Sequence, residues 1–134
     1  MKLKQIYLHI GLEKTGTTSI QYALSRSRPM LREANILYPL TPGNVNHIDL
    51  CGYAMEDEPE NPIHARLIKQ YETLQKFRRV FRNKFIKEIE ESEIDTLILS
   101  NEHLSSTLKT PNDLNRLKNL LDPCLLYTSD AADE

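Results

Sequence analysis

A run of glycine, threonine and lysine residues near the N-terminus has the composition of an anion-binding loop. It reads GLEKTGTTS at residues 11–19 and follows the short apolar segment Gln5–Ile10. A glycine loop between a strand and a helix presents backbone N–H groups and the positive end of the helix dipole to an anion. This pattern predicts a phosphate site; the alternative is an ordinary polar turn. The predicted binding residues are Gly11, Lys14, Thr15, Gly16, Thr17, Thr18 and Ser19.

The loop departs from the nucleoside triphosphate pattern GxxxxGK[ST] at its lysine. Gly11, Gly16 and Thr18 match that pattern, but Thr17 stands at the lysine position and Lys14 lies inside the loop. A lysine displaced in this way does not reach the β- and γ-phosphates of a bound nucleotide. The sequence therefore favours a phosphate-containing ligand other than Mg²⁺-ATP.

The segment Ile6–Gln21 resembles the 5′-phosphosulfate loop of sulfotransferases that use 3′-phosphoadenosine 5′-phosphosulfate (PAPS). In that family a Lys-x-Gly-Thr-Thr core follows the first strand and opens the first helix. The resemblance implies that Lys14 binds the phosphosulfate and stabilises the bridging oxygen as the sulfuryl group leaves. It also implies that Gly16, Thr17 and Thr18 surround the 5′-phosphate, and that catalysis needs no metal ion.

Sulfuryl transfer to an alcohol also needs a group that accepts the hydroxyl proton. In an open parallel sheet that group is expected at the carboxyl end of a strand, where Glu102 and His103 follow the apolar segment Asp95–Ser100. Branches of the family that this chain resembles use a glutamate, which assigns the base to Glu102 and leaves His103 in reserve. The alternative is that Glu102 stabilises the first turn of a helix.

The other three histidines are weaker candidates for a functional role. His47 follows a proline-glycine loop and is predicted either to line the acceptor cleft, as in similar sequences, or to lie at the surface or cap a helix. His9 is predicted to be a hydrogen-bonded residue of the first strand, and His64 to be solvated.

Alternating apolar segments indicate the elements that position these residues. The predicted strands are Gln5–Ile10, Ile36–Pro39 and Asp95–Ser100. Helical periodicity predicts a helix from Thr17 that ends before Pro29, a helix or turn at Met30–Asn35, a helix at Asn46–Met55, one long helix at Pro62–Ile89 and a helix at Pro111–Leu121. The sequence therefore predicts an α/β, P-loop-like three-layer fold with a mostly parallel sheet that is incomplete at its C-terminus.

The polar side of the predicted long helix is strongly basic. Its basic residues are Lys76, Arg78, Arg79, Arg82, Lys84 and Lys87. This face is predicted either to guide an anionic glycan or lipid headgroup or simply to contact water.

The segment 124–134, CLLYTSDAADE, stops in mid-pattern. Back-translated into codons, it resembles the transposon-end adapter of sequencing libraries, so we expect it to be non-native. Residues 1–123 are then expected to be the N-terminal part of a single sulfotransferase-like domain. The resemblance implies that the arginine and serine that bind the 3′-phosphate of PAPS follow a later strand, so the fragment is expected to be inactive alone.

Composition excludes several classes of protein. With 17 Lys and Arg against 19 Asp and Glu, a formal net charge of −2 and no long apolar run, the chain predicts neither a nucleic-acid partner nor a membrane span. Two cysteines without a Cys/His cluster predict no structural metal, and the absence of a signal peptide predicts a cytoplasmic location. The oligomeric state is not predicted.

Together these features predict a sulfotransferase that moves a sulfuryl group from PAPS to a hydroxyl of a glycan, lipid or small-molecule acceptor. The alternatives are a nucleotide-dependent phosphotransferase and a non-catalytic phosphate-binding domain.

Overall fold

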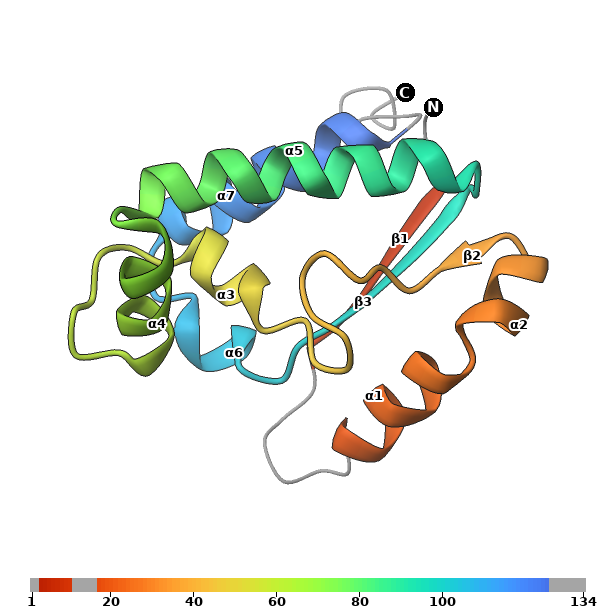
Figure 1. The fold of residues 1–134 in the computed structure, drawn as a ribbon, viewed down its shortest axis with the longest axis horizontal. Coiled ribbons are helices and arrows are strands. Elements are labelled where there is room, and N and C mark those ends of the chain that lie inside the picture. The colour runs from red at the N-terminus through yellow and green to blue at the C-terminus, as the bar shows by residue number, and fades with distance from the viewer. Residues whose placement is uncertain (1–2, 11–16, 126–134) are drawn as a thin grey trace.

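The computed structural model describes residues 3–10 and 17–125, and this part of the chain is α/β (Figure 1). Its strands are β1 (Gln5–His9), β2 (Ile36–Leu37) and β3 (Thr96–Ser100). Its helices are α1 (Thr17–Arg26), α2 (Arg28–Glu33), α3 (Asp49–Ala54), α4 (Pro62–Tyr71), α5 (Leu74–Ser92), α6 (Leu104–Thr107) and α7 (Pro111–Leu121), with a final 3-10 turn at Asp122–Cys124. The predicted α/β class and parallel sheet are confirmed.

The three described strands form one parallel sheet in the order β1-β3-β2. Gln5 and Ile36 both lie opposite Thr96, so β3 is paired on both sides. Beyond the strands, the backbone N–H of Asn101 donates to the carbonyl of His9 at 3.0 Å. Because all three strands run in the same direction, residues at the ends of β1 and β3 meet at one carboxyl edge.

One face of the sheet packs against α3, α5 and α7, while α1 and α2 lie on the other side (Figure 1). Leu97 and Leu99 of β3 are fully buried in the first interface. The long helix α5 contributes a row of apolar side chains to it, namely Phe77, Phe81, Phe85 and Ile89. On the opposite face Tyr7 is 54% exposed, so this side of β1 is only partly covered. The main core therefore lies between the sheet and α5.

The apolar stripe predicted as one helix at Pro62–Ile89 belongs to two helices, so that prediction is wrong. Glu72, with a φ of 77°, ends α4. Thr73 then caps α5, because its side chain accepts a hydrogen bond from the backbone N–H of Lys76 at 3.1 Å. The periodic pattern predicted the buried side of both helices, but it contains no signal for the break.

Two other helices begin at residues that differ from the prediction. The segment predicted to start at Met30 starts at Arg28, with Pro29 in the first helical turn, where its missing N–H carries no penalty. The helix predicted at Asn46–Met55 instead begins at Asp49. Both differences shift a helix start and leave the order of elements unchanged.

The Asn61 side chain caps α4, because it accepts a hydrogen bond from the backbone N–H of Ile63 at 2.8 Å. His64 in the same helix is buried, so the prediction that it is solvated is wrong. Its Nδ1 accepts a hydrogen bond from the backbone N–H of Glu58 at 2.9 Å. The acidic segment before α4 thus folds back onto the helix and covers the imidazole.

We expect Thr73→Ala to lower the free energy of unfolding by about 1 kcal/mol, because the first turn of α5 loses its capping hydrogen bond. Thr73→Ser keeps the hydroxyl and is the matched control. Urea denaturation of the three proteins measures the difference. Equal stability of the alanine and serine variants would contradict the capping role.

Candidate functional site

The predicted phosphate loop has the expected flanking elements. β1 ends at His9 and α1 begins at Thr17, which confirms the order strand, connecting segment, helix. Gly11, Lys14, Thr15 and Gly16 lie outside the described residues. Thr17 and Thr18 belong to α1, but the structure describes only their backbone. Ser19 is exposed on the same helix. The ligand contacts of all seven residues stay predictions.

Ser100, the last residue of β3, connects α1 to the carboxyl edge of the sheet. Its hydroxyl lies 2.9 Å from Nδ1 of His9 at the end of β1. The buried amide of Gln21 donates to the Ser100 hydroxyl at 3.2 Å and to its carbonyl at 3.4 Å. Since Gln21 lies in the second turn of α1, these bonds hold the positive end of that helix beside the ends of β1 and β3.

His47 joins the β2–α3 loop to the same strand end. Its backbone N–H donates to the Ser100 carbonyl at 3.0 Å, and the Ser100 N–H donates to His47 Nδ1 at 3.1 Å. With Nδ1 an acceptor, Nε2 carries the proton and donates to the Pro39 carbonyl at 2.9 Å. His47 is 0% exposed and has no ring nitrogen left for an acceptor molecule. The alternative prediction of a surface position is therefore wrong, and a buried ring with both nitrogens engaged does not support a contact with an acceptor.

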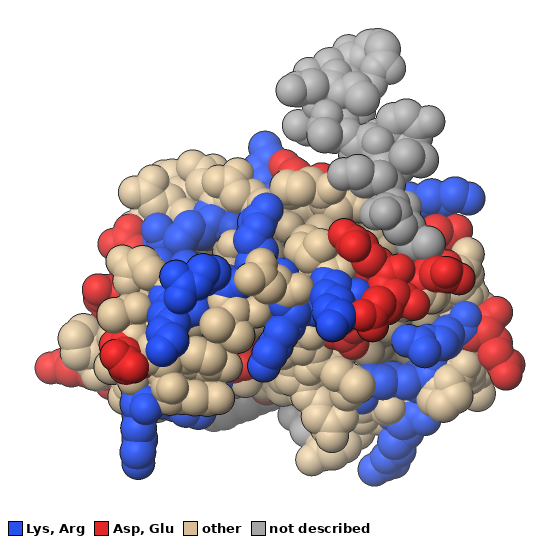
Figure 2. All heavy atoms as spheres, turned by 45° about the horizontal axis from the view of Figure 1, so that its top comes forward, with Lys and Arg blue, Asp and Glu red and all other residues tan. Residues whose placement is uncertain are grey.

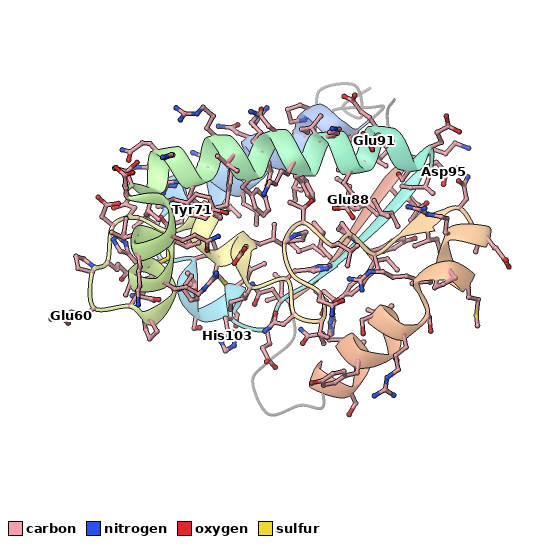
Figure 3. The ribbon with its side chains drawn as sticks, viewed as in Figure 1. Glu60, Tyr71, Glu88, Glu91, Asp95 and His103 are labelled. Carbon is pink, nitrogen blue, oxygen red and sulfur yellow. The ribbon has the colours of Figure 1, made fainter. Side chains whose placement is uncertain are left out.

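The loop that carries His47 is held from two helices. The guanidinium of Arg28, on α2, donates to the Asn44 carbonyl at 2.6 Å and to its side-chain oxygen at 2.9 Å. From α5, the carboxylate of Glu88 accepts from the backbone N–H groups of Leu40 at 2.6 Å and Thr41 at 2.9 Å (Figure 3). These charge-assisted bonds fix the loop against both helices.

Burial keeps two side chains near the carboxyl edge of the sheet, those of Tyr38 and Cys51, in their neutral forms. It raises the pKa of Tyr38 to about 12, although the nearby Arg28 acts in the opposite direction. Burial also raises the pKa of the Cys51 thiol, whose sulfur accepts from Asn101 Nδ2 at 3.0 Å. A neutral, buried and hydrogen-bonded thiol is not a reactive nucleophile. These residues support the edge and do not carry out chemistry.

Asn101 positions the predicted base. Its buried amide donates to the His47 carbonyl at 2.9 Å and accepts from the His103 N–H at 2.8 Å. Between them, the Glu102 side chain is 17% exposed, and its Oε1 lies 3.8 Å from Nε2 of His103. His103 lies beyond the end of β3, opposite the end at which Asp95 precedes that strand (Figure 3). Both predicted residues therefore lie at the carboxyl edge.

The alternative role of Glu102 also has a structural basis. Glu102 directly precedes His103, the N-cap of α6, so its charge lies near the start of that helix. However, α6 is only four residues long, and a single helical turn has a small dipole. The position of Glu102 is compatible with a role as proton acceptor and with a role in stabilising α6. Substitution of Glu102 distinguishes the two.

The predicted basic face lies on the outer side of α5, where Figure 2 shows Lys and Arg side chains gathered. Several of these cations already have partners in the fold. Arg78 donates to the backbone carbonyls of Tyr53 and Met55, and Arg82 donates to that of Asn119. The face thus partly serves to hold α3 and α7 against α5.

Comparisons of the chain with protein-family models, curated proteins and solved structures found no match. Within residues 3–10 and 17–125, no group of three or more His, Cys, Asp or Glu side chains could hold a metal ion. In the same residues, no helix is long and apolar enough to cross a membrane.

No sequence motif singles out Ser100, a polar residue that the structure places at the end of β3. Ser100 resembles any small residue at a strand end, and its importance follows from partners on three other elements. The sequence carries only a weak signal for Gln21. It lies four residues after Thr17, so the two residues share one face of α1.

We expect the His47 imidazole to make stability depend on pH. Burial and the nearby charge of Arg28 lower the pKa of His47 from 6.5 to about 3, against the opposing effect of the Pro39 carbonyl. Between these values the unfolded chain binds a proton that the native protein does not. The free energy of unfolding should therefore fall by about 1.4 kcal/mol per unit as pH is lowered through this range.

The variant His47→Asn, which removes the titrating group, is the control. It should be less stable than wild type at pH 7.5, because the bond to Pro39 is lost. Its disadvantage should then shrink as pH falls from 6 to 4 in urea denaturation experiments. A stability gap that does not change with pH would show that His47 does not titrate as the structure indicates.

Proposed function

We propose that the chain is the cofactor-binding part of a PAPS-dependent sulfotransferase with a P-loop-like three-layer fold, acting on a hydroxyl of a glycan, lipid or small-molecule acceptor. The observation that supports this most is the convergence at one edge of the sheet. The KTGTTS segment leads into α1, and Gln21 anchors that helix beside the strand that delivers Glu102.

The surroundings of α1 suit an anionic sulfuryl donor. This ten-residue helix has no acidic side chain in its first turn, so nothing in that turn opposes an anion at its positive end. We assign Lys14 to the phosphosulfate and the N–H groups of Gly16, Thr17 and Thr18 to the 5′-phosphate. A fixed ammonium group and aligned amides stabilise the charge that develops on the leaving phosphate.

The proposed reaction is an in-line displacement at sulfur. The acceptor oxygen forms a bond to sulfur while the bond between sulfur and the bridging oxygen breaks, and adenosine 3′,5′-bisphosphate leaves. The hydroxyl proton passes to the carboxylate of Glu102, whose position is set by the bonds of Asn101 on either side. His103, within 3.8 Å of that carboxylate, is placed to receive the proton next.

Calorimetry of the full-length protein tests the cofactor. We expect adenosine 3′,5′-bisphosphate to bind more tightly than Mg²⁺-ATP, and Lys14→Ala to weaken its binding by roughly 10-fold or more, because a charge-assisted contact is lost. Lys84→Ala, on the outer side of α5, is the matched control and should bind normally. Preference for Mg²⁺-ATP would instead favour a phosphotransferase.

Substitution of Glu102 tests the base. In the full-length enzyme, Glu102→Gln should reduce turnover by roughly 10²-fold while the affinity for adenosine 3′,5′-bisphosphate is retained, because an amide cannot accept the proton. Glu60→Gln, an exposed position before α4, is the control. Normal turnover by the Glu102 variant would assign that residue to helix stabilisation alone.

A further inference from the structure

A surface cavity of about 310 Å³ lies at the side of the sheet formed by β2. Its described lining comes from α2, from β2 and the loop that follows it, and from α5, and in Figure 1 β2 lies between those two helices. The volume is at the lower end of the range for small-molecule sites. None of the described lining residues is assigned above to sulfuryl transfer, so the proposed reaction gives this cavity no role.

Apolar side chains form part of the cavity wall. Leu37 of β2 belongs to the core, whereas Leu40 in the following loop is 56% exposed. The backbone N–H of Leu40 donates to Glu88 at 2.6 Å, so a fixed piece of chain carries this exposed side chain. A ligand group that covers Leu40 removes apolar surface from water, which stabilises a complex. The cavity therefore favours a ligand with an apolar body.

Two of the charged residues that line the cavity are already engaged within the fold. The Arg28 guanidinium donates four hydrogen bonds to the β2–α3 loop, which leaves one of its five N–H groups. The Glu88 carboxylate accepts three, from the backbone N–H groups of Leu40 and Thr41 and from the Thr41 hydroxyl. These two side chains hold the loop, and their opposite charges offset each other.

Arg32, in the last turn of α2, also lines the cavity. In the part of the chain that the structure describes, its guanidinium has no hydrogen bond or ion pair. Its charge is therefore the one that the neighbouring side chains do not balance. A guanidinium presents parallel N–H groups that match the two oxygens of a carboxylate. The cavity thus combines an apolar wall with an available carboxylate-binding group.

We propose that this cavity binds a small organic carboxylate, with its charged group on Arg32 and its apolar body against Leu37 and Leu40. An inorganic phosphate ion would pair with the guanidinium but leave the apolar wall in water. A neutral apolar molecule would cover the wall but leave the cation without a partner. The proposal concerns a second ligand site and does not depend on the sulfotransferase function.

Three probes test the chemistry of the ligand. In calorimetry of the full-length protein, we expect 4-phenylbutanoate to bind with a Kd on the order of 1 mM. The neutral 4-phenylbutanamide has nearly the same shape and should bind roughly 10-fold more weakly or less, because the charge-assisted pair is lost. Inorganic phosphate should also bind more weakly than the acid. No binding of the acid, equal binding of the amide, or tighter binding of phosphate would each overturn the proposal.

Variants of the lining test the location. Arg32→Gln should weaken binding of 4-phenylbutanoate roughly 10-fold without lowering the Tm, because the guanidinium has no partner in the described fold. Arg32→Lys keeps the charge without the paired N–H groups and should give an intermediate Kd. Leu40→Ala should weaken the acid and the amide alike, by several-fold. Arg26→Gln, at the end of α1, is the matched control and should bind normally. Wild-type affinity in Arg32→Gln or in Leu40→Ala would overturn the proposal.

Discussion

The reciprocal hydrogen bonds between His47 and Ser100 determine how the carboxyl edge is assembled. They require an imidazole that accepts at one nitrogen and donates at the other, and burial enforces this neutral form by lowering its pKa. His9 and Gln21 meet the same serine from β1 and α1. One small residue at a strand end thus sets the relative positions of two strands, a helix and a loop, and the proposed ligand site is built on that arrangement.

The charges of α5 are arranged against its helix dipole, with basic residues between Lys76 and Lys87 and acidic residues only from Glu88 to Glu91. This placement is unfavourable for an isolated helix. Arg78 offsets it by binding the Tyr53 and Met55 carbonyls at the end of α3, where a cation is favoured. Glu88 similarly binds the backbone N–H of Leu40 in the β2–α3 loop. Charges that do not help α5 itself therefore organise the elements around it.

Local patterns predicted the elements well and their partners poorly. Helix α7 spans Pro111–Leu121, as its apolar spacing and initial proline indicate. The break at Thr73 escaped prediction because a capping threonine and one on the polar side of a helix look alike in sequence. The burial of His47 escaped because Ser100, its main partner, is 53 residues away. The edge containing Glu102 was predictable from strand direction, while its chemistry depends on contacts that periodicity does not encode.

The pairing of β1 with β3 also constrains the order in which the molecule folds. His9 and Ser100 are 91 residues apart, so the chain must close a long loop before their contact forms, at a large cost in conformational entropy. Contacts between α4 and α5 are local and need no such closure. We therefore expect the helices to associate first and the carboxyl edge last. During synthesis, the residues proposed to bind the sulfuryl donor and the proposed base Glu102 come together only after β3 has left the ribosome.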